Sequence, residues 1–437
     1  KIEDYDVYFM LGTALMETGN FSKAVAPLGR ARTIKKDTKI YEASARCYRN
    51  LKETSTLSSI LREWIAFDSK RYDIKIELGS LMLDENKIPE AISMLSDASR
   101  FIPSEPKPYI LLAKAYEIQG NDKMRFEQLS TALKFAPQNW EIHYQLARHY
   151  ISTGNSDKAE QHFASCIKLN PSYGVPHFEF GLLLLDRDKI LPAANEFKTA
   201  LDIEPNNPMY LALDALTSAL TNQQQRALDN ITIALGKGPN DARILYYAGL
   251  VYKNIGRYES AIQKFNEALT LDPSNALALE ALGDIHMEQT QFKGAAEKYF
   301  KAWEKGGYSE KRAFKLGNAL LYDSKFIEAK DFYETIIKRN PGFSEALFRL
   351  TFIYCELGDL KSARSTLPLF KNDGTPWMQI AQGKIYETEN NLEAALVAYK
   401  IAKRVTPDNP YIHSGFGRIY LKQKLFDSSI IEFSAAA

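Results

Sequence analysis

The side chains best suited to metal binding or acid–base chemistry in this sequence are six histidines: His143, His149, His162, His177, His286 and His413. His143 and His177 are 34 residues apart, a spacing that becomes significant below. If equivalent segments of the chain stack on one another, these two side chains lie in neighbouring helices, and a metal pair is one interpretation. Zinc sites take three or four ligands at short spacing, and no such set is present. Packing between helices is therefore the favoured interpretation, and we expect no metal.

Three cysteines, Cys47, Cys166 and Cys355, are more than 100 residues apart and form no CxxC pair, so neither a disulfide framework nor a zinc site is indicated. The phosphate-binding, metalloprotease and serine-hydrolase patterns GxGxxG, GxxxxGK[ST], HExxH and GxSxG are missing too. We therefore expect no catalytic residue and no cofactor. Cys166 has the spacing of a small buried residue.

Composition excludes further classes. The 437 residues carry 55 Lys+Arg and 54 Asp+Glu, a net charge of +1, which disfavours sequence-independent binding to nucleic acid. No apolar run approaches the roughly 18 residues that cross a bilayer, so direct membrane insertion is not expected. A cytoplasmic location is slightly favoured, with a periplasmic one left open because the sequence starts at Lys1.

The elements that position these residues follow a repeat of about 34 residues. A small residue recurs at one phase, and nine consecutive steps from Ala45 to Thr351 are 34 residues long. Its members are Gly12, Ala45, Gly79, Ala113, Ala147, Gly181, Ala215, Gly249, Gly283, Gly317, Thr351, Gly383 and Gly417. Alanine dominates a second phase twelve residues later, and large apolar residues fill a third phase four residues beyond that. Agreement among three phases indicates a structural repeat.

Within each unit, apolar residues recur every three or four positions in two blocks, which predicts two helices joined by a polar turn. Eight prolines at one phase end the units, because proline cannot continue a helix: Pro103, Pro137, Pro171, Pro205, Pro239, Pro273, Pro341 and Pro407. Two residues further on, Asn139, Asn207, Asp241, Asn275 and Asn409 stand where the cap of the next helix belongs. The unit is a helical hairpin.

This pattern resembles the tetratricopeptide repeats over essentially the whole chain. The family's signature can be read at Leu282 and Gly283, followed by Ala295, Tyr299 and Ala302. The resemblance implies an all-α, right-handed α-solenoid superhelix of about 13 stacked antiparallel hairpins. It implies a surface for partner proteins and not a particular chemistry.

Repeats 1–11 are expected in residues 1–375 and repeats 12 and 13 in residues 376–437, with the last one truncated. Repeat 2 (residues 38–71) diverges, since Leu57 and Trp64 replace small residues, and a distorted hairpin is expected there. Arg125 replaces an alanine and is expected to reach solvent. Residues 371–376 are the candidate kink. Neither end has a polar capping unit, so we expect the native protein to extend further or a partner to cover the open end.

In the family, the first helix of each repeat lines a concave groove, and positions 2, 5, 9 and 12 point into it. From repeats 5 to 8 these positions are apolar: Tyr144, Ile151, Val175, Phe178, Leu182, Leu185, Met209, Leu216, Tyr246 and Leu250. One interpretation is a groove for an apolar peptide or an amphipathic helix of a partner protein. The other is that these side chains pack against the next helix.

Charged side chains and one amide flank this apolar stretch and would orient a partner: Lys107, Lys114, Arg148, Glu280, Asp284, Lys311, Lys315 and Asn318. The carboxylate-clamp subtype of the family requires Asn and Lys where Ala281, Tyr246 and Leu250 stand, so that subtype is not indicated. The asparagine ladder of the sugar-transferase subtype is also missing.

The sequence therefore predicts a protein-interaction scaffold or adaptor, without enzymatic activity of its own, in a larger assembly. The alternative is the substrate-recruiting arm of an enzyme whose catalytic domain lies outside this chain. RNA binding of the pentatricopeptide kind is disfavoured by the 34-residue period and the balanced charge.

Overall fold

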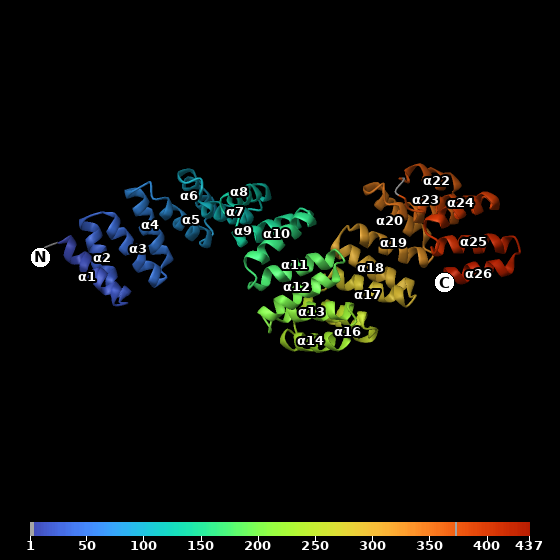
Figure 1. The fold of residues 1–437 in the computed structure, drawn as a ribbon, viewed down its shortest axis with the longest axis horizontal. Helices are drawn as coiled ribbons and strands as arrows, with labels where there is room; N and C mark the ends of the chain where they lie inside the picture. The colour runs from blue at the N-terminus through green and yellow to red at the C-terminus, as the bar shows by residue number, and fades with distance from the viewer. Residues whose placement is uncertain (1–3, 372–373) are drawn as a thin grey trace. The chain divides into compact units, whose positions relative to one another are not determined.

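The computed structural model describes residues 4–371 and 374–437, and in these residues it contains 26 α-helices, one 3₁₀ helix and no strand (Figure 1). The chain divides into two compact units, residues 1–205 and 206–437. The first unit contains α1 (Tyr5–Glu17), α2 (Phe21–Ile34), α3 (Thr38–Leu51), α4 (Thr54–Phe67), α5 (Tyr72–Asp84), α6 (Ile88–Phe101), α7 (Pro106–Ile118), α8 (Asp122–Phe135), α9 (Trp140–Ser152), α10 (Ser156–Leu169), α11 (Gly174–Asp186) and α12 (Ile190–Ile203).

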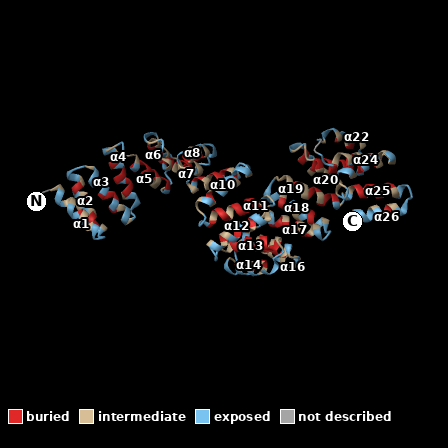
Figure 2. Cartoon of the chain, in the orientation of Figure 1, coloured by how far each residue is buried: buried red, intermediate tan, exposed pale blue. Residues whose placement is uncertain are grey.

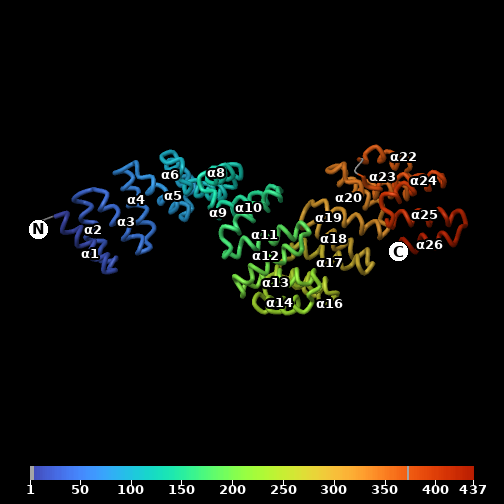
Figure 3. Tube along the Cα trace, viewed as in Figure 1, coloured from blue at the N-terminus to red at the C-terminus, as the bar shows by residue number. Residues whose placement is uncertain are grey.

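The second unit contains α13 (Pro208–Leu220), α14 (Gln224–Lys237), α15 (Ala242–Asn254), α16 (Tyr258–Leu271), α17 (Ala276–Glu288), α18 (Phe292–Gly306), α19 (Glu310–Tyr322), α20 (Phe326–Arg339), α21 (Ser344–Glu356), α22 (Leu360–Ser365), the 3₁₀ helix η1 (Leu367–Leu369), α23 (Trp377–Thr388), α24 (Leu392–Val405), α25 (Pro410–Lys422) and α26 (Phe426–Ala436). Within each unit the helices pair into consecutive hairpins that stack on their neighbours in sequence, as the tube of Figure 3 shows. The all-α class and the stacked hairpins predicted from the repeat are confirmed.

The predicted helix boundaries follow from local chemistry. Asn139, Asn207, Asp241, Asn275 and Asn409 each accept a hydrogen bond from a backbone N–H of the helix that follows, as predicted for N-caps. Each phase proline lies two residues beyond the end of a helix; α12, for example, ends at Ile203 and α24 at Val405. The proline ring and the missing N–H thus set where the second helix of a repeat stops.

The turn inside every hairpin needs one residue with a left-handed backbone. Glycine supplies it, at φ between 68° and 79°, in Gly19, Gly120, Gly154, Gly256 and Gly358. The equivalent place in the remaining turns is held by non-glycine residues with φ of 55–60°: Lys52, Asn86, Asp188, Asn222, Thr290, Ser324, Asn390 and Lys424. Since a left-handed conformation is unfavourable for most side chains, packing of the two helices enforces these turns.

The core lies along the line where paired helices meet, which Figure 2 shows as buried stripes on facing helix sides. At the small-residue phase the backbone of the first helix touches an aromatic or leucine side chain of the second. A Cβ added to Gly181 would come within 2.6 Å of Phe197 Cε1, and one added to Gly79 within 2.6 Å of Leu95 Cγ. Glycine therefore recurs because it lets the helices of a hairpin approach this closely.

Repeat 2 still forms a hairpin, α3–α4, with Leu57 and Trp64 buried in it. Trp64 stacks on Tyr41 with ring centroids 6.1 Å apart. Large side chains therefore fill positions that small residues hold in most other repeats, and the expected distortion of this hairpin stays a prediction.

One expectation about the core is wrong. Arg125 does not reach solvent: it is 6% exposed, and its guanidinium lies 3.7 Å from Glu117 and 3.8 Å from Asp122. It also donates a hydrogen bond of 3.4 Å to Gln145. A long side chain at an alanine position is accommodated because Asp122 of its own helix and Glu117 and Gln145 of the adjacent helices satisfy its charge.

Repeat 11 departs from the regular hairpin. Its second helix, α22, ends at Ser365, and η1 follows with Pro368 near its start. Because proline lacks an N–H, it ends the α-helical ladder several residues early. The candidate kink at 371–376 includes Asn372 and Asp373, which lie outside the described residues, and the division at residue 375 stays a prediction.

Candidate functional site: an apolar depression on α9 and α11

In the first unit, part of the predicted groove forms an open depression of about 500 Å³ between α9 and α11. We call it the α9–α11 depression; it is lined by Arg148, Ile151, Ser152, Phe178, Glu179, Leu182, Leu183 and Asp186. Four of these, Arg148, Ile151, Phe178 and Leu182, were predicted from repeat position alone. Ser152, Glu179, Leu183 and Asp186 were missed. Ser152 and Asp186 both stand at position 13 of their repeats, so the same phase would have found these two together.

The floor of the depression is apolar. Ile151 is 43% exposed, and Phe178 and Leu182 are half-buried one helical turn apart on α11. Phe178 keeps its orientation because its ring lies 6.4 Å from that of Phe197, which is fully buried. Because this contact fixes the orientation of Phe178, the exposed part of its ring remains an apolar surface facing solvent.

The polar edge of the depression is already internally paired. Tyr144 donates a hydrogen bond of 2.8 Å to Glu179, and burial together with that carboxylate raises the pKa of Tyr144. Arg148 lies between Glu117 at 3.7 Å and Glu179 at 3.9 Å, and Lys114 lies 3.8 Å from Asp84. The predicted basic strip is therefore an alternation of opposite charges with little net field. Exposed pairs of this kind contribute about 0–1 kcal/mol each.

The predicted groove residues of the second unit serve packing instead. Leu216 is 4% exposed and lies inside the core, because α13 packs against both α14 and α15. Its assignment to an open groove is wrong. Tyr246 and Leu250 pack, half-buried, against the cluster around Phe265 and Leu282. Val175 and Leu185 of the first unit and Met209 of the second are also half-buried.

The polar residues predicted to flank the second half of the groove form bonds within and between repeats. Glu280 pairs with the buried Arg312 at 2.6 Å, and Asp284 accepts from Lys315 at 2.6 Å and from Tyr299 at 2.6 Å. Asn318 accepts from the hydroxyl of Tyr333. Lys107 and Lys311 are exposed. The ion pairs to Arg312 and Lys315 join successive hairpins, whereas the two tyrosine bonds lie within one hairpin. Glu280, Asp284, Lys315 and Asn318 therefore already have partners within the chain.

The histidines are structural. The Nδ1 atoms of His143 and His162 are 3.0 Å apart, whereas His177 Nδ1 lies 2.6 Å from Glu196. His143 and His177 therefore have different partners and do not form the metal pair considered above. No group of three or more His, Cys, Asp or Glu side chains in the described part of the chain is arranged to hold a metal ion.

A recurring hydrogen bond explains the histidine phase. His143, His177 and His413 each place Nε2 within 3.1 Å of the carbonyl oxygen of the proline six residues earlier. Tyr109 makes the equivalent bond to Pro103 through its hydroxyl. The carbonyl at the end of one repeat is thereby satisfied by a side chain of the next. The sequence signal for this contact was a histidine or tyrosine six residues after a phase proline.

The three cysteines are buried, and burial raises the pKa of the Cys166 thiol to about 11. A thiol that stays protonated is a poor nucleophile, which agrees with the structural role expected for Cys166. Within the same described ranges, no helix combines the length and the apolar character that a membrane span requires.

We expect the stability of the first unit to fall between pH 7 and pH 5. Burial, with His143 next to it, lowers the pKa of His162 from 6.5 to about 4. In the unfolded chain His162 takes up a proton near pH 6.5, whereas in the folded chain it stays neutral until about pH 4. The contribution of His162 to the free energy of unfolding is therefore complete above pH 6.5 and declines as the pH falls toward 4. The loss by pH 5 is at most about 2 kcal/mol.

Urea unfolding at several pH values measures this loss. His162→Phe removes the titrating group while retaining an aromatic ring beside Tyr150. Its stability should depend less on pH than that of the wild-type chain, with the difference largest between pH 6.5 and 5. Equal slopes for the two proteins would contradict the assignment to His162.

The fold and the groove define a helical-repeat protein. Family profiles described as "Tetratricopeptide repeat" and "TPR repeat" match residues 141–173 and 249–290. The profiles thus show tetratricopeptide repeats in these two stretches, and the thirteen hairpins of the described residues agree with the resemblance along the rest of the chain.

Among known proteins, the chain is similar to human "Tetratricopeptide repeat protein 6", at 30% identity over 28% of this chain and 24% of that protein. It is 23% identical to "Anaphase-promoting complex subunit 7" of Arabidopsis thaliana, over 41% of this chain and 27% of that one. The chain thus spans about a quarter of the length of these relatives. A solved structure, the "APC/C hetero-tetramer Cut9-Hcn1", aligns with 99% of this chain and 93% of that chain at 12% identity and a TM-score of 0.46.

Proposed function

We propose that this chain is a protein-interaction scaffold, without catalytic activity of its own, that acts as a subunit of a larger assembly. Its α9–α11 depression holds an apolar peptide or the apolar face of an amphipathic helix from a partner protein. The observation that carries the proposal is the open volume of about 500 Å³ floored by Ile151, Phe178 and Leu182.

The shape of the depression indicates what it accommodates. Phe178 and Leu182 are four residues apart on one helix, so a partner helix crossing α11 would contribute apolar side chains at i and i+3 or i+4. Arg148 and Asp186 stand at the margin with opposite charge and fix the orientation of the partner without adding much affinity. The apolar floor supplies the binding free energy through area removed from water.

The relatives support the scaffold role at the level of the family. "Anaphase-promoting complex subunit 7" is, by its name, a component of a multiprotein complex. A net charge of +1 and the absence of catalytic motifs point in the same direction. Protein partners are therefore favoured over nucleic acid.

Leu182→Asp tests the proposal. A carboxylate on the floor of the depression has to be desolvated when a partner binds, so we expect affinity to fall at least about tenfold. The measurement is capture of partners from an extract of the source organism, with quantitative mass spectrometry of the captured proteins. Circular dichroism has to show an unchanged helix content.

Leu191→Asp is the matched control, because Leu191 lies on α12 of the same hairpin as Leu182 and is 68% exposed outside the depression. This variant should capture the same partners as the wild type. If Leu182→Asp also captures them undiminished while remaining folded, the depression is not the binding site.

A further inference from the structure

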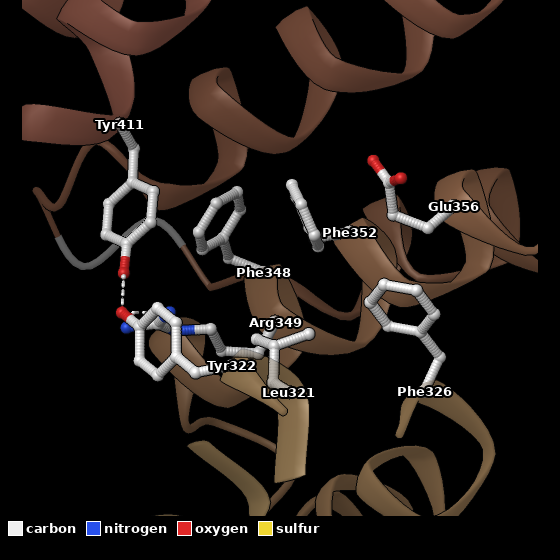
Figure 4. Close-up of a pocket in the computed structure, with 8 residues that line it drawn as sticks. All are labelled: Leu321, Tyr322, Phe326, Phe348, Arg349, Phe352, Glu356 and Tyr411. Atoms are coloured by element: carbon white, nitrogen blue, oxygen red, sulfur yellow. Dashed lines mark hydrogen bonds between the residues drawn. The ribbon is translucent and has the colours of Figure 1, made fainter. Parts of the chain in front are cut away.

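The second unit contains a more enclosed cavity, of about 230 Å³, in repeats that the sequence did not mark as a groove. Five of its lining side chains are aromatic: Tyr322 at the end of α19, Phe326 at the start of α20, Phe348 and Phe352 on α21, and Tyr411 on α25. Tyr411 of α25 closes one side (Figure 4). We call this space the Arg349 cavity, after the one arginine in its wall.

The cavity exists because repeat 11 is irregular. The hydroxyl groups of Tyr322 and Tyr411 are 3.2 Å apart although the residues are separated by 89 positions. In this repeat α22 is only 6 residues long, and α21 packs against α23 as well as against α22. Trp377 stacks on Phe348 with ring centroids 5.3 Å apart and supports the wall from behind.

Arg349 is the unusual member of this apolar wall. It is 6% exposed, and its Nε–H has no hydrogen-bond acceptor. Its other nitrogens donate to Glu345 at 3.2 Å and to the Tyr322 hydroxyl at 3.4 Å, and the guanidinium carbon lies 4.7 Å from the centre of the Tyr411 ring. A buried donor without an acceptor is costly, so this one is suited to an acceptor that arrives with a ligand.

The charges of the cavity select against a cationic ligand. Aromatic walls and a carboxylate, Glu356, would suit a quaternary ammonium group. However, Glu356 is neutralised by Lys384 at 2.7 Å and Arg349 is paired with Glu345 at 3.2 Å, so no uncompensated carboxylate is left to attract a cation. An uncharged aromatic group would pack against the rings of the wall, and a carbonyl oxygen next to it would accept a hydrogen bond from Arg349 Nε–H.

We propose that the Arg349 cavity takes one aromatic side chain from an extended segment of a partner protein, with a backbone carbonyl of that segment accepting from Arg349 Nε. The volume is sufficient for a single ring and not for a helix. The inference rests on the proposed function in that the ligand is again a protein. It assigns a second, separate site, in residues 206–437, with its own specificity.

The experiment uses N-acetyl-L-phenylalaninamide, which carries one ring and two carbonyl groups, as the probe. Saturation-transfer NMR on the full chain should show transfer to the ring protons with a Kd of about 1 mM, as expected for a fragment of this size. Tetramethylammonium and N-acetyl-L-alaninamide are the comparison probes, and neither should bind.

Three variants localise the signal. Phe352→Ala removes one wall of the cavity and should abolish transfer. Arg349→Met keeps the aliphatic stem but loses the donor, and should weaken binding about five- to tenfold. Leu182→Asp, which is designed to disable the α9–α11 depression, should leave the probe bound as in the wild type. Circular dichroism checks that each variant is folded.

The outcomes separate the two proposals. Loss of the probe signal in Phe352→Ala and its retention in Leu182→Asp support an aromatic side-chain site at Arg349, whatever happens to partner capture. Binding of tetramethylammonium in place of the probe overturns the inference in favour of a cation site. No binding of the aromatic probe to folded wild-type chain, or equal binding to all variants, also overturns it.

Discussion

Replacing Arg418 by methionine is expected to lower the free energy of unfolding by about 3–5 kcal/mol. Arg418 donates from Nε and a terminal nitrogen to the two oxygens of Glu387, at 2.8 and 3.0 Å, and Glu387 is only 4% exposed. Without the guanidinium, the carboxylate of Glu387 retains one side-chain hydrogen bond, from the Tyr399 hydroxyl at 3.2 Å, and it stays in surroundings of low dielectric constant. An uncompensated buried charge is among the largest single destabilising effects.

Urea unfolding followed by circular dichroism measures this change, and the double variant Arg418→Met, Glu387→Met is its control. Removing both charges leaves apolar side chains of similar length, so the double variant should lie within about 1 kcal/mol of the wild type. A double variant as unstable as the single one would show that lost packing, and not the unpaired carboxylate, is responsible.

The second large effect is expected at Gly181. Valine at this position would place a Cβ about 2.6 Å from Phe197 Cε1, far inside van der Waals contact. Phe197 is fully buried and has no free space to move into, so the α11–α12 hairpin must open. We expect a loss of about 3 kcal/mol in the free energy of unfolding.

Gly29→Ala is the matched control for Gly181. Gly29 also lies inside a helix of the first unit, α2, but a Cβ added there would have no neighbouring atom within 4 Å. Alanine there should raise stability by about 0.5–1 kcal/mol, because it reduces the freedom of the unfolded chain. Thermal and urea unfolding give both values, and equal destabilisation of the two variants would refute the role given to the close contact at Gly181.

The features that could be predicted from the sequence are those set by local chemistry. Period, helix ends, caps and turns each depend on one or two residues, such as Asn275 at a cap or Pro273 beyond a helix. The small residues at the helix crossing could be predicted too, because sterics at Gly181 or Gly249 act within one hairpin. Fold class followed from these signals together.

The site could be predicted only in part, because it depends on contacts between repeats. Position along the repeat located Phe178 and Leu182, but it did not show that Leu216, at an equivalent phase, is covered by its neighbours. Arg125 was expected outside because its acceptors, Glu117 and Gln145, come from other helices. Side-chain pairing of this kind is decided by rotamers and burial, which a periodic pattern does not encode.

The Arg349 cavity was missed for a different reason. Phe348 and Phe352 occupy positions 5 and 9 of repeat 11, but the apolar groove was predicted in repeats 5 to 8 only. Their enclosure depends on Tyr411, two repeats later, and on the early end of α22 at Ser365. Where a repeat is irregular, the position of a residue in the repeat no longer predicts which residues it contacts.

The hydrogen bond between Tyr322 and Tyr411 also bears on how this protein acquires its structure. In a stack of hairpins nearly every interaction joins residues close in sequence, so contact order is low and assembly can spread from any nucleus. The two tyrosines instead close a loop of 89 residues, and the conformational entropy lost on closing this loop opposes formation of the bond. Repeats 10 to 13 should consequently gain and lose their order together, as one foldon within an otherwise gradually fraying chain.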